Sequence, residues 1–281
     1  LSLSSMGADM ADINNDGYPE IFTTEMLPDD EYKLKTNTSF DTYTNYAIKV
    51  KEGFSHQYMH NTLQLNNRDE TFSEIAFYSG VAASDWSWGA LLMDADNDGY
   101  RDIYVCNGIY QDVIDQDFIN FFANKEKQKM VMQGTKTQMN EIISKMPSNP
   151  IPNKFYRNNK NLQFDDKAKD WGLGEPSFSN GASYGDLDND GDLDLVVNNV
   201  NQESFVFENK TNEVLDHHYL TINLKGSDKN TFAIGSKVII HKGDELLNFQ
   251  MIPSRGFQSS IDYKMVFGLG RYRNCCDIRT Y

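Results

Sequence analysis

A frame of fifteen residues occurs three times in this sequence and limits what the chain can fold into. Each copy begins with Gly-Ala, places acidic or amide side chains at alternate positions, and ends in apolar residues typical of a β-strand. The copies span residues 7–21, 89–103 and 181–195. Such internal repetition is typical of stacked architectures, in which each unit buries its apolar surface against its neighbours.

The second and third copies belong to a longer repeat that continues upstream without a gap. Asn61 and Asn153 are 92 residues apart. The same offset relates Phe72 to Phe164, Ala76 to Ala168, Gly80 to Gly172 and Gly89 to Gly181. A further, partial echo of the repeat ends at Asn209. Agreement at so many positions in one register indicates duplicated structural units.

Each unit consists of short segments of alternating residues, separated by Asn, Gly and Asp turns. This pattern predicts an all-β fold, an incomplete β-propeller with about three visible blades followed by a small C-terminal β domain. We place the propeller in residues 1–212 and the C-terminal domain in residues 213–281. Two insertions, near residues 25–60 and 108–150, interrupt the repeat, and we expect them between blades, as loops on one face. The second insertion contains a predicted helix from Asp117 to Met146.

Each frame also contains Asp-x-Asn/Asp-x-Asp-Gly, which places oxygen-bearing side chains at loop positions 1, 3 and 5. Glycine at position 6 permits a sharp turn, position 7 offers a backbone carbonyl, and a further carboxylate lies at position 9. Hard oxygen ligands in this number suit Ca²⁺ better than Mg²⁺, so we predict about three structural calcium ions. The predicted ligands are Asp12, Asn14, Asp16, Tyr18 and Glu20 in the first loop, Asp94, Asp96, Asp98, Tyr100 and Asp102 in the second, and Asp186, Asp188, Asp190, Asp192 and Asp194 in the third.

Two other interpretations of these loops are weaker. An EF-hand requires a glutamate at loop position 12, where this chain has Thr23, Val105 and Val197. Asx-rich turns also occur without any metal. Three copies of one oxygen pattern favour metal, because carboxylates this close together repel one another unless a cation lies between them.

The charge of the chain narrows the possible partners. Its 26 Lys and Arg stand against 41 Asp and Glu, which gives a formal net charge of −15. So acidic a surface does not suit nucleic acid or anionic lipid, both of which are bound through basic residues. Three calcium ions would bring the net charge from −15 to −9. No run of about 18 apolar residues occurs, so no membrane span is predicted in this sequence.

At the level of families, the three loops resemble the FG-GAP/VCBS-type repeats of integrin-α-like β-propellers. The segment from His218 to Gly270 resembles the ASPIC/UnbV domain, with matching pieces at 233–238, at 255–260 and in the closing Phe-Gly-Leu-Gly. The pairing of the two is similar to the cartilage-acidic-protein-like family, which is common among exported proteins of Bacteroidetes. The resemblance implies a calcium-loop propeller that works outside the cytoplasm.

The sequence departs from that family in two places. The family's propellers have about seven blades, so we expect an N-terminal part outside the present sequence. The tail after Gly270 lacks the apolar strand with which the domain normally ends. We therefore expect the C-terminal domain to be truncated.

These observations lead to a prediction of function. Calcium loops of extracellular modules bind with Kd of about 10⁻⁴–10⁻³ M, so they fill outside the cell and not in the cytosol. We predict an extracytoplasmic, calcium-stabilised propeller that acts as a non-enzymatic binding, adhesion or scaffold module, with a protein or glycan as its ligand. The alternative is a polysaccharide-active enzyme, a lyase or hydrolase, on the same propeller, since a fold does not determine an activity.

Other motifs have ordinary interpretations beside functional ones. His56 and His60 have zincin spacing, but Gln57 stands where the glutamate general base is required. Trp86 aligns with Phe178 and is expected in a blade core, with sugar stacking as the alternative for the three tryptophans Trp86, Trp88 and Trp171. The inserted helix is expected to cover the propeller, with a partner-binding lid as the alternative.

Overall fold

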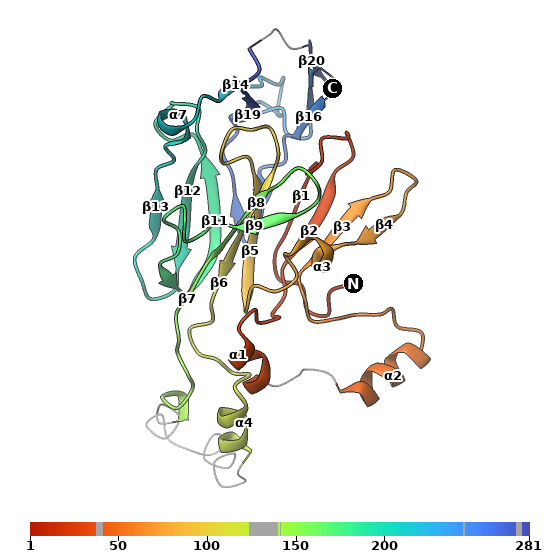
Figure 1. Cartoon of the computed structure of the whole chain (residues 1–281), viewed down its shortest axis with the longest axis vertical. Helices are drawn as coiled ribbons and strands as arrows, with labels where there is room; N and C mark the ends of the chain where they lie inside the picture. The colour runs from red at the N-terminus through yellow and green to blue at the C-terminus, as the bar shows by residue number, and fades with distance from the viewer. Residues whose placement is uncertain (38–41, 124–139, 141, 244, 274–276) are drawn as a thin grey trace.

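Three antiparallel sheets stand side by side in the computed structural model and form the three predicted blades (Figure 1). The structure describes residues 1–37, 42–123, 140, 142–243, 245–273 and 277–281. Blade 1 contains β1 (Ala8–Ala11), β2 (Glu20–Thr23), β3 (Thr62–Asn66) and β4 (Phe72–Glu74). Blade 2 contains β5 (Ser87–Met93), β6 (Asp102–Asn107), β8 (Lys154–Asn158) and β9 (Phe164–Asp166). Blade 3 contains β11 (Ser179–Gly185), β12 (Asp194–Asn199) and β13 (Phe205–Phe207).

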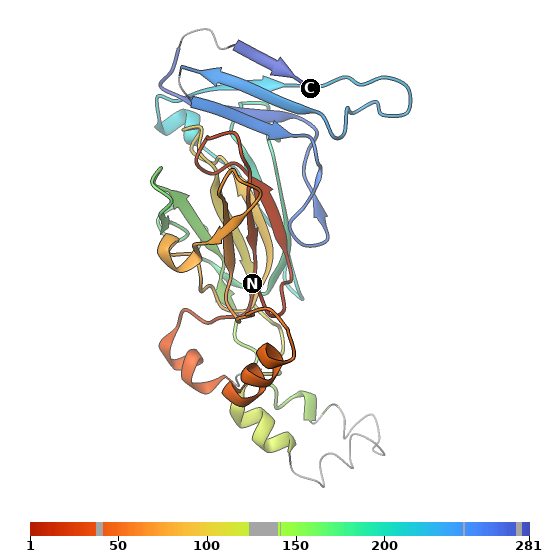
Figure 2. The same ribbon diagram turned by 90° about the vertical axis from the view of Figure 1, so that its right-hand side faces the viewer.

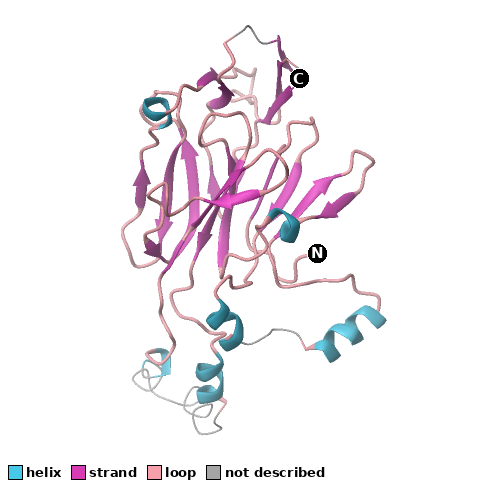
Figure 3. Cartoon of the chain, in the orientation of Figure 1, coloured by secondary structure: helices cyan, strands magenta, loops and turns pink. Residues whose placement is uncertain are grey.

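The 92-residue repeat is visible in the strand bounds. β8 and β9 lie at that offset from β3 and β4, and β11 and β12 lie at it from β5 and β6. The first strands of neighbouring blades pack together, with β1 and β11 on the two sides of β5. This arrangement confirms the all-β, propeller-like architecture that the sequence predicts. Figure 3 shows strands through the body of the molecule and most of the helices at one end.

The two insertions lie within blades rather than between them, which corrects our expectation. Each connects the second strand of a blade to the third, over residues 24–61 in blade 1 and 108–153 in blade 2. They do project at a common end of the molecule, as expected, at the lower end in Figure 1. The first carries α1 (Glu31–Thr36) and α2 (Tyr43–Lys51), and the second carries α4 (Gln116–Phe122) and β7 (Ile151–Pro152), which pairs with β10 (Pro176–Ser177). A short helix, α3 (Ala76–Ser79), follows β4.

The helix predicted from Asp117 to Met146 is helical near both of its ends in the described residues, in α4 and again at residues 140 and 142–143. Asp115 caps α4, because its Oδ1 accepts a hydrogen bond from the Phe118 amide at 2.8 Å. Most of the rest of the predicted helix falls on residues 124–139 and 141, outside the described residues.

The C-terminal domain follows α7 (Thr211–Val214) and consists of short antiparallel strands. These are β14 (His218–Ile222), β15 (Lys237–Lys242), β16 (Glu245–Gln250), β17 (Ser254–Arg255), β18 (Ser259–Ser260), β19 (Met265–Gly270) and β20 (Asp277–Thr280). β14 pairs with β19, and β15 pairs with both β16 and β20. The unusual tail therefore still adds a strand, although all four residues of β20 are exposed.

One hydrophobic core runs from the blades into the C-terminal domain. It includes Leu91 and Tyr104 of blade 2, Val197 of blade 3, and Val238 and Phe267 of the C-terminal domain, each at most 1% exposed. A second cluster fills the space between blades 1 and 2. Because blades and C-terminal domain share a core, they form one structural body.

Candidate metal centres

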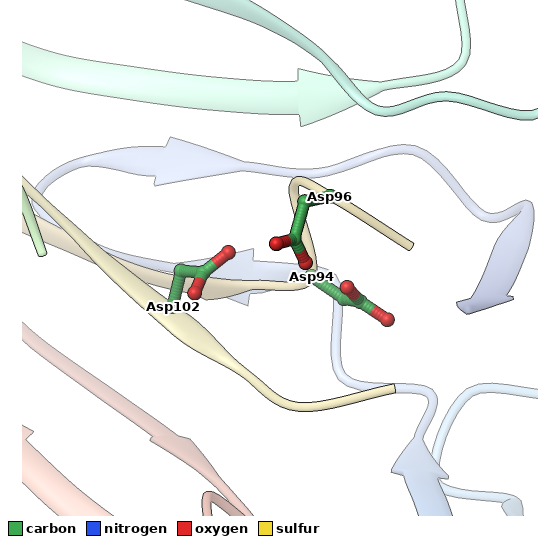
Figure 4. Close-up of side chains that lie close together, drawn as sticks. All are labelled: Asp94, Asp96 and Asp102. Carbon is green, nitrogen blue, oxygen red and sulfur yellow. The ribbon is translucent and has the colours of Figure 1, made fainter. Parts of the chain in front are cut away.

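The second loop brings its carboxylates together inside the protein. Oxygen atoms of Asp94, Asp96 and Asp102 lie within 4.8 Å of one another, and all three residues are buried (Figure 4). Asp94 and Asp96 belong to the turn after β5, and Asp102 begins β6. The loop thus joins the first two strands of blade 2 and directs its oxygens to a common point.

The loop conformation follows from residue types that recur in all three copies. Asparagine occupies position 4 each time, as Asn15, Asn97 and Asn189, with φ of 59°, 53° and 66°. A left-handed conformation is costly for most residues but tolerated by asparagine. The glycine at position 6 adopts φ of 96° in the second loop, where it leaves the backbone N–H free to reach the first ligand.

Backbone amides orient the first aspartate of the second loop. The amide of Asp98 donates to Asp94 Oδ1 at 3.1 Å, and that of Gly99 donates to Oδ2 at 2.9 Å. The carboxylate at position 9 is held in the same way, since the amide of Ala95 donates to Asp102 Oδ2 at 3.1 Å. The ligands are therefore held in place by the loop backbone itself.

The third loop also gathers three carboxylates, at positions 1, 3 and 5 rather than 1, 3 and 9, in a more open setting. Oxygens of Asp186, Asp188 and Asp190 lie within 4.8 Å of one another, but Asp188 is exposed. The amide of Leu187 donates to Asp194 Oδ2 at 2.8 Å, as Ala95 does to Asp102. At position 7 the Asp192 carboxylate accepts from Asn97 Nδ2 and from the Asn212 amide, and ligation by its backbone carbonyl stays a prediction.

The first loop has the same hydrogen bonds with one fewer carboxylate. Asp12 accepts from the amides of Asp16 at 3.2 Å and Gly17 at 2.8 Å, and Glu20 accepts from the Ile13 amide at 2.9 Å. Position 3 is Asn14, whose oxygen is uncharged. The first loop is therefore the least charged of the three.

Burial disfavours ionisation of several carboxylates in these loops. Burial raises the pKa of Glu20 to about 8, that of Asp94 to about 7 and that of Asp192 to about 6. Neighbouring carboxylates add to the effect, as Asp98 and Asp96 do for Asp94. A bound cation would reverse this situation, because it stabilises the ionised form.

Basic side chains partly neutralise the loops from outside. Arg68 pairs with Asp16 at 2.8 Å, Arg157 pairs with Asp96 at 2.6 Å, and Lys160 pairs with Asp98 at 3.2 Å. Arg68 and Lys160 are related by the 92-residue offset and stand in equivalent hairpins. The cation of the third loop, Lys264, comes instead from the C-terminal domain and lies 3.1 Å from Asp186 Oδ2.

The residues present fit a calcium ion. Asp96 Oδ1 and Asp186 Oδ1 are buried oxygen atoms without a hydrogen-bond partner, in residues 5% and 7% exposed. An unpartnered buried carboxylate oxygen is costly, and each belongs to a cluster of hard oxygen donors of the kind that Ca²⁺ prefers. Six of the fifteen predicted ligands are thus brought together, three in the second loop and three in the third, and a metal would supply the missing partner.

Sequence reasoning missed the asparagines that link one loop to the next. Asn15 Nδ2 donates to the Gly99 carbonyl at 3.0 Å, and Asn97 Nδ2 donates to the Gly191 carbonyl at 3.2 Å. The signal was available, since asparagine occupies position 4 in every copy. These bonds connect blades 1 and 2 and blades 2 and 3 beside the metal ligands.

A second set of asparagines, at the ends of the third strands, was also missed. Asn158 Nδ2 donates to the carbonyls of Ile13 and Arg101 at 2.8 and 3.0 Å, and so joins the loops of blades 1 and 2. Asn209 Nδ2 donates to the carbonyls of Ala95 and Leu193 at 2.7 and 3.2 Å, and so joins those of blades 2 and 3. Asn209, at the end of the partial repeat in the sequence, therefore links blade 2 to blade 3.

The C-terminal domain covers the same end of the blades. Asn248 Nδ2 donates to Asp12 Oδ2 at 2.6 Å, the Tyr100 hydroxyl donates to Glu245 at 3.1 Å, and Lys264 reaches the third loop. All three loops are thus in contact with this domain. The sequence gives no sign of these contacts, because they join residues far apart in the chain.

A hairpin of this domain, β17–β18, also takes the place of a neighbouring blade. A Cβ on Gly89 would lie 2.8 Å from the Asn180 carbonyl of blade 3, whereas a Cβ on the equivalent Gly181 would lie 2.6 Å from Ser259 Oγ of the hairpin. The hairpin also reaches blade 1, where Arg255 Nη1 donates to Asp9 Oδ1 at 2.7 Å. Figure 2 shows it descending from the C-terminal domain beside the blades.

The remaining candidates do not form a metal site in the described residues. His60 is buried and its Nδ1 lies 2.6 Å from the Asn61 carbonyl, while His56 is exposed and contacts Tyr46. Trp88 is partly buried, and its indole N–H donates to the Gly108 carbonyl at 2.8 Å. Trp171 remains 37% exposed.

Comparison with protein families identifies two regions of the chain. Residues 142–197 match the FG-GAP-like repeat, and residues 226–279 match the ASPIC and UnbV family. The first match covers the third metal loop, and the second covers most of the C-terminal domain. A search of curated proteins gave no match. The chain therefore carries an FG-GAP-like repeat and an ASPIC/UnbV domain, while the narrower assignment to the cartilage-acidic-protein-like family stays a prediction.

Proposed function

Because the chain carries an FG-GAP-like repeat and an ASPIC/UnbV domain, we propose that it is a calcium-stabilised propeller that binds a protein or glycan outside the cytoplasm and catalyses no reaction. One observation carries the proposal: carboxylates converge in two of the three recurring loops, and one buried oxygen in each of these two clusters lacks a partner. FG-GAP repeats are typical of extracellular proteins, where calcium is abundant enough to fill weak sites.

The proposed role of calcium is structural. The side chains at positions 1, 3, 5 and 9 and the carbonyl at position 7 would hold the ion, which would neutralise carboxylates that now repel one another. Since Asn15 and Asn97 join the loops of successive blades, ordering a loop also orders the contact between blades. Among the described residues, no helix is long and apolar enough to cross a bilayer.

Thermal unfolding tests this proposal. The chain is unfolded in excess EDTA, in about 2 mM CaCl₂ and in the same concentration of MgCl₂. Each occupied site adds RT ln(1 + [L]/Kd), so three sites of the expected affinity add roughly 2–5 kcal/mol to the free energy of unfolding. A rise in Tm with calcium but not magnesium is expected. Equal Tm values in calcium and EDTA would contradict the proposal.

One observation favours the enzymatic alternative. The Tyr46 hydroxyl lies 2.6 Å from His56 Nδ1 and 3.0 Å from the Tyr58 hydroxyl, on an exposed surface of the first insertion. The hydrogen bond to Tyr58 raises the pKa of Tyr46, so this hydroxyl stays protonated at neutral pH. Incubation with anionic and neutral polysaccharides, followed by an assay for new reducing or unsaturated ends, tests it. Product that disappears in Tyr46→Phe would establish the enzyme, and the absence of product would leave the binding role.

A further inference from the structure

A small cavity lies where the first two blades meet the C-terminal domain. Its volume is about 50 Å³, which leaves room for a few water molecules or for one small oxyanion. Three basic side chains line it: Arg101 from the second loop, and Lys237 and Arg255 from the C-terminal domain. No acidic residue is among the described residues of its wall. In a chain with a net charge of −15, such a wall needs a physical reason.

Arg101 is buried, and part of its guanidinium lacks a partner. The residue is 6% exposed, and Nη1 is a buried nitrogen without a hydrogen-bond partner among the described residues. Burial raises the pKa of Asp94 and Arg101 offsets part of that rise, so the two residues lie near each other. Both oxygens of Asp94, however, accept from backbone amides of its own loop. Because a buried charge without a partner is costly, an anion beside Arg101 would stabilise the protein.

The internal repeat shows that the loop itself does not need this arginine. Arg101 occupies loop position 8, where the first loop has Pro19 and the third has Leu193. Leu193 is 4% exposed and belongs to the core that the blades share with the C-terminal domain. The fold therefore accepts an apolar residue at this position. A buried arginine in the second loop alone indicates that its charge has a ligand.

Arg255 brings a second guanidinium to the cavity. Its side chain is 7% exposed, and Nη1 donates to Asp9 Oδ1 at 2.7 Å, whereas Nε is buried and has no partner among the described residues. Asp9 also accepts from two backbone amides, so its oxygens are already in use. The guanidinium groups of Arg255 and Arg101 both lie against the ring of Phe249, at 5.1 and 5.4 Å from its centroid. The two positive groups therefore share one environment.

A third donor without an acceptor lies nearby. Tyr184 is 5% exposed, and its buried hydroxyl has no hydrogen-bond partner among the described residues. Burial raises the pKa of Tyr184, while Arg255 and Arg101 both lower it, which places the hydroxyl near the two arginines. This region thus has more buried donors than acceptors. A water molecule could accept some of these hydrogen bonds, but it would leave the charge of Arg101 uncompensated.

We propose that this cavity binds a small oxyanion of the sulfate or phosphate type between Arg101 and Arg255. A guanidinium group forms paired, charge-assisted hydrogen bonds with the oxygens of such an anion. The walls come from blade 1, blade 2 and the C-terminal domain, so the anion joins that domain to the blades. It is a ligand additional to calcium and to the protein or glycan of the proposed function.

Calorimetric titration of the full chain with sodium sulfate tests the inference. The titration is carried out in calcium at constant ionic strength, and Tm is recorded at each sulfate concentration. We expect saturable binding of one sulfate and a rise in Tm that levels off. General stabilisation by sulfate, which acts through its exclusion from the protein surface, does not saturate in this way.

A pair of matched variants locates the site. Arg101→Leu introduces the residue that blade 3 has at this position, and it should bind sulfate about ten- to a hundredfold more weakly. Its Tm without sulfate should equal or exceed that of the unmodified chain, because an unpaired buried charge is removed. Arg273→Leu makes the same change at a side chain that is 68% exposed and should bind sulfate as the unmodified chain does.

Galactose 6-sulfate distinguishes two sources of the anion. Binding weaker than that of free sulfate would support the site and identify a free anion as its ligand. Tighter binding would support the site and identify the sulfate group of a larger molecule.

Three outcomes would overturn the inference. These are the absence of saturable sulfate binding, binding that Arg101→Leu leaves unchanged, and an Arg101→Leu chain that loses stability in sulfate-free buffer while sulfate does not stabilise the unmodified chain. The last result would show that Arg101 serves packing beside Asp94. The calcium-dependent rise in Tm is measured without sulfate, so the failure of one proposal leaves the other standing.

Discussion

The second and third candidate metal loops share six of the nine residues from Asp94 to Asp102 and from Asp186 to Asp194 but have different surroundings. The second lies between two neighbouring loops, with Asn15 donating to Gly99 on one side and Asn97 donating to Gly191 on the other, and its residues from Asp94 to Gly99 are all buried. The third has a blade on one side only. Its Leu187 is 59% exposed, and its Asn189 oxygen accepts from Lys264 of the C-terminal domain.

The difference shows that the motif defines the ligands while the neighbours define their environment. In the second loop, removing a ligand leaves buried charge without compensation. In the third loop, which is exposed, water can replace much of the solvation that a removed carboxylate provided to its neighbours. We therefore expect the three candidate sites to contribute unequally to the stability of the protein, although their sequences are similar.

The largest effect is expected for Asp96→Asn. The change removes a predicted ligand and the shorter of two ion pairs of Arg157, which is 34% exposed at its side chain and keeps Asp98 at 3.4 Å. Breaking a buried pair costs about 3–5 kcal/mol, and partial exposure reduces this to about 2–3 kcal/mol. Asp188→Asn changes the same position of the exposed third loop and should cost about 1 kcal/mol or less.

Urea unfolding in calcium and in EDTA measures both variants. If Asp188→Asn lowered the free energy of unfolding as much as Asp96→Asn, the contrast between the two loops would be wrong, because exposure of the third loop would then not affect its contribution to stability.

The pH dependence of stability gives a second comparison. Burial raises the pKa of Glu20 to about 8 and of Asp94 to about 7, but that of Asp192 only to about 6. A carboxyl whose pKa is raised in the folded state contributes stability below its unfolded pKa and loses it as pH rises through the folded value. In EDTA the chain should therefore lose stability as pH rises from about 5 to 8.

Calcium should reverse this trend, because it binds deprotonated ligands. The difference in Tm between calcium and EDTA should be small near pH 5 and increase toward pH 8. The titration can be recorded for Asp96→Asn and Asp188→Asn as well. The part above about pH 7 should be smaller in Asp96→Asn, where Glu20 of the first loop still contributes, and unchanged in Asp188→Asn. A calcium effect independent of pH would contradict protonation of the loops.

The smallest effect is expected from the basic residues beside the loops. Lys264 is 15% exposed at its side chain and pairs with Asp186, whereas Lys160 is 48% exposed and pairs with Asp98. Lys264→Gln should lower stability in EDTA by about 1 kcal/mol and strengthen calcium binding a few-fold, since a competing cation is removed. Lys160→Gln should change both quantities less.

Calorimetric titration with calcium measures the affinities, and unfolding in EDTA measures the stabilities. Weaker calcium binding in Lys264→Gln would show that the lysine positions ligands rather than competing with the ion.

The repeat allowed much of this architecture to be predicted. The strand bounds of blades 2 and 3 follow the 92-residue offset, and the loops contain the predicted carboxylates. The insertions were misplaced because each separates two strands of one sheet, and pairing across such a distance leaves no local signal. The basic side chains beside the loops were missed for the same reason, since Lys264 contacts Asp186 only after the chain has folded.

The position of the C-terminal domain has a consequence for the order in which parts of the protein fold during synthesis. Arg255 and Asp9 are 246 residues apart, so their contact forms only after the segment between them has been synthesised. N-terminal units generally fold first, and contacts between distant residues form slowly. A chain interrupted before Arg255 would lack Phe267, and the apolar partners of Phe267 in the shared core would stay open to proteases and chaperones.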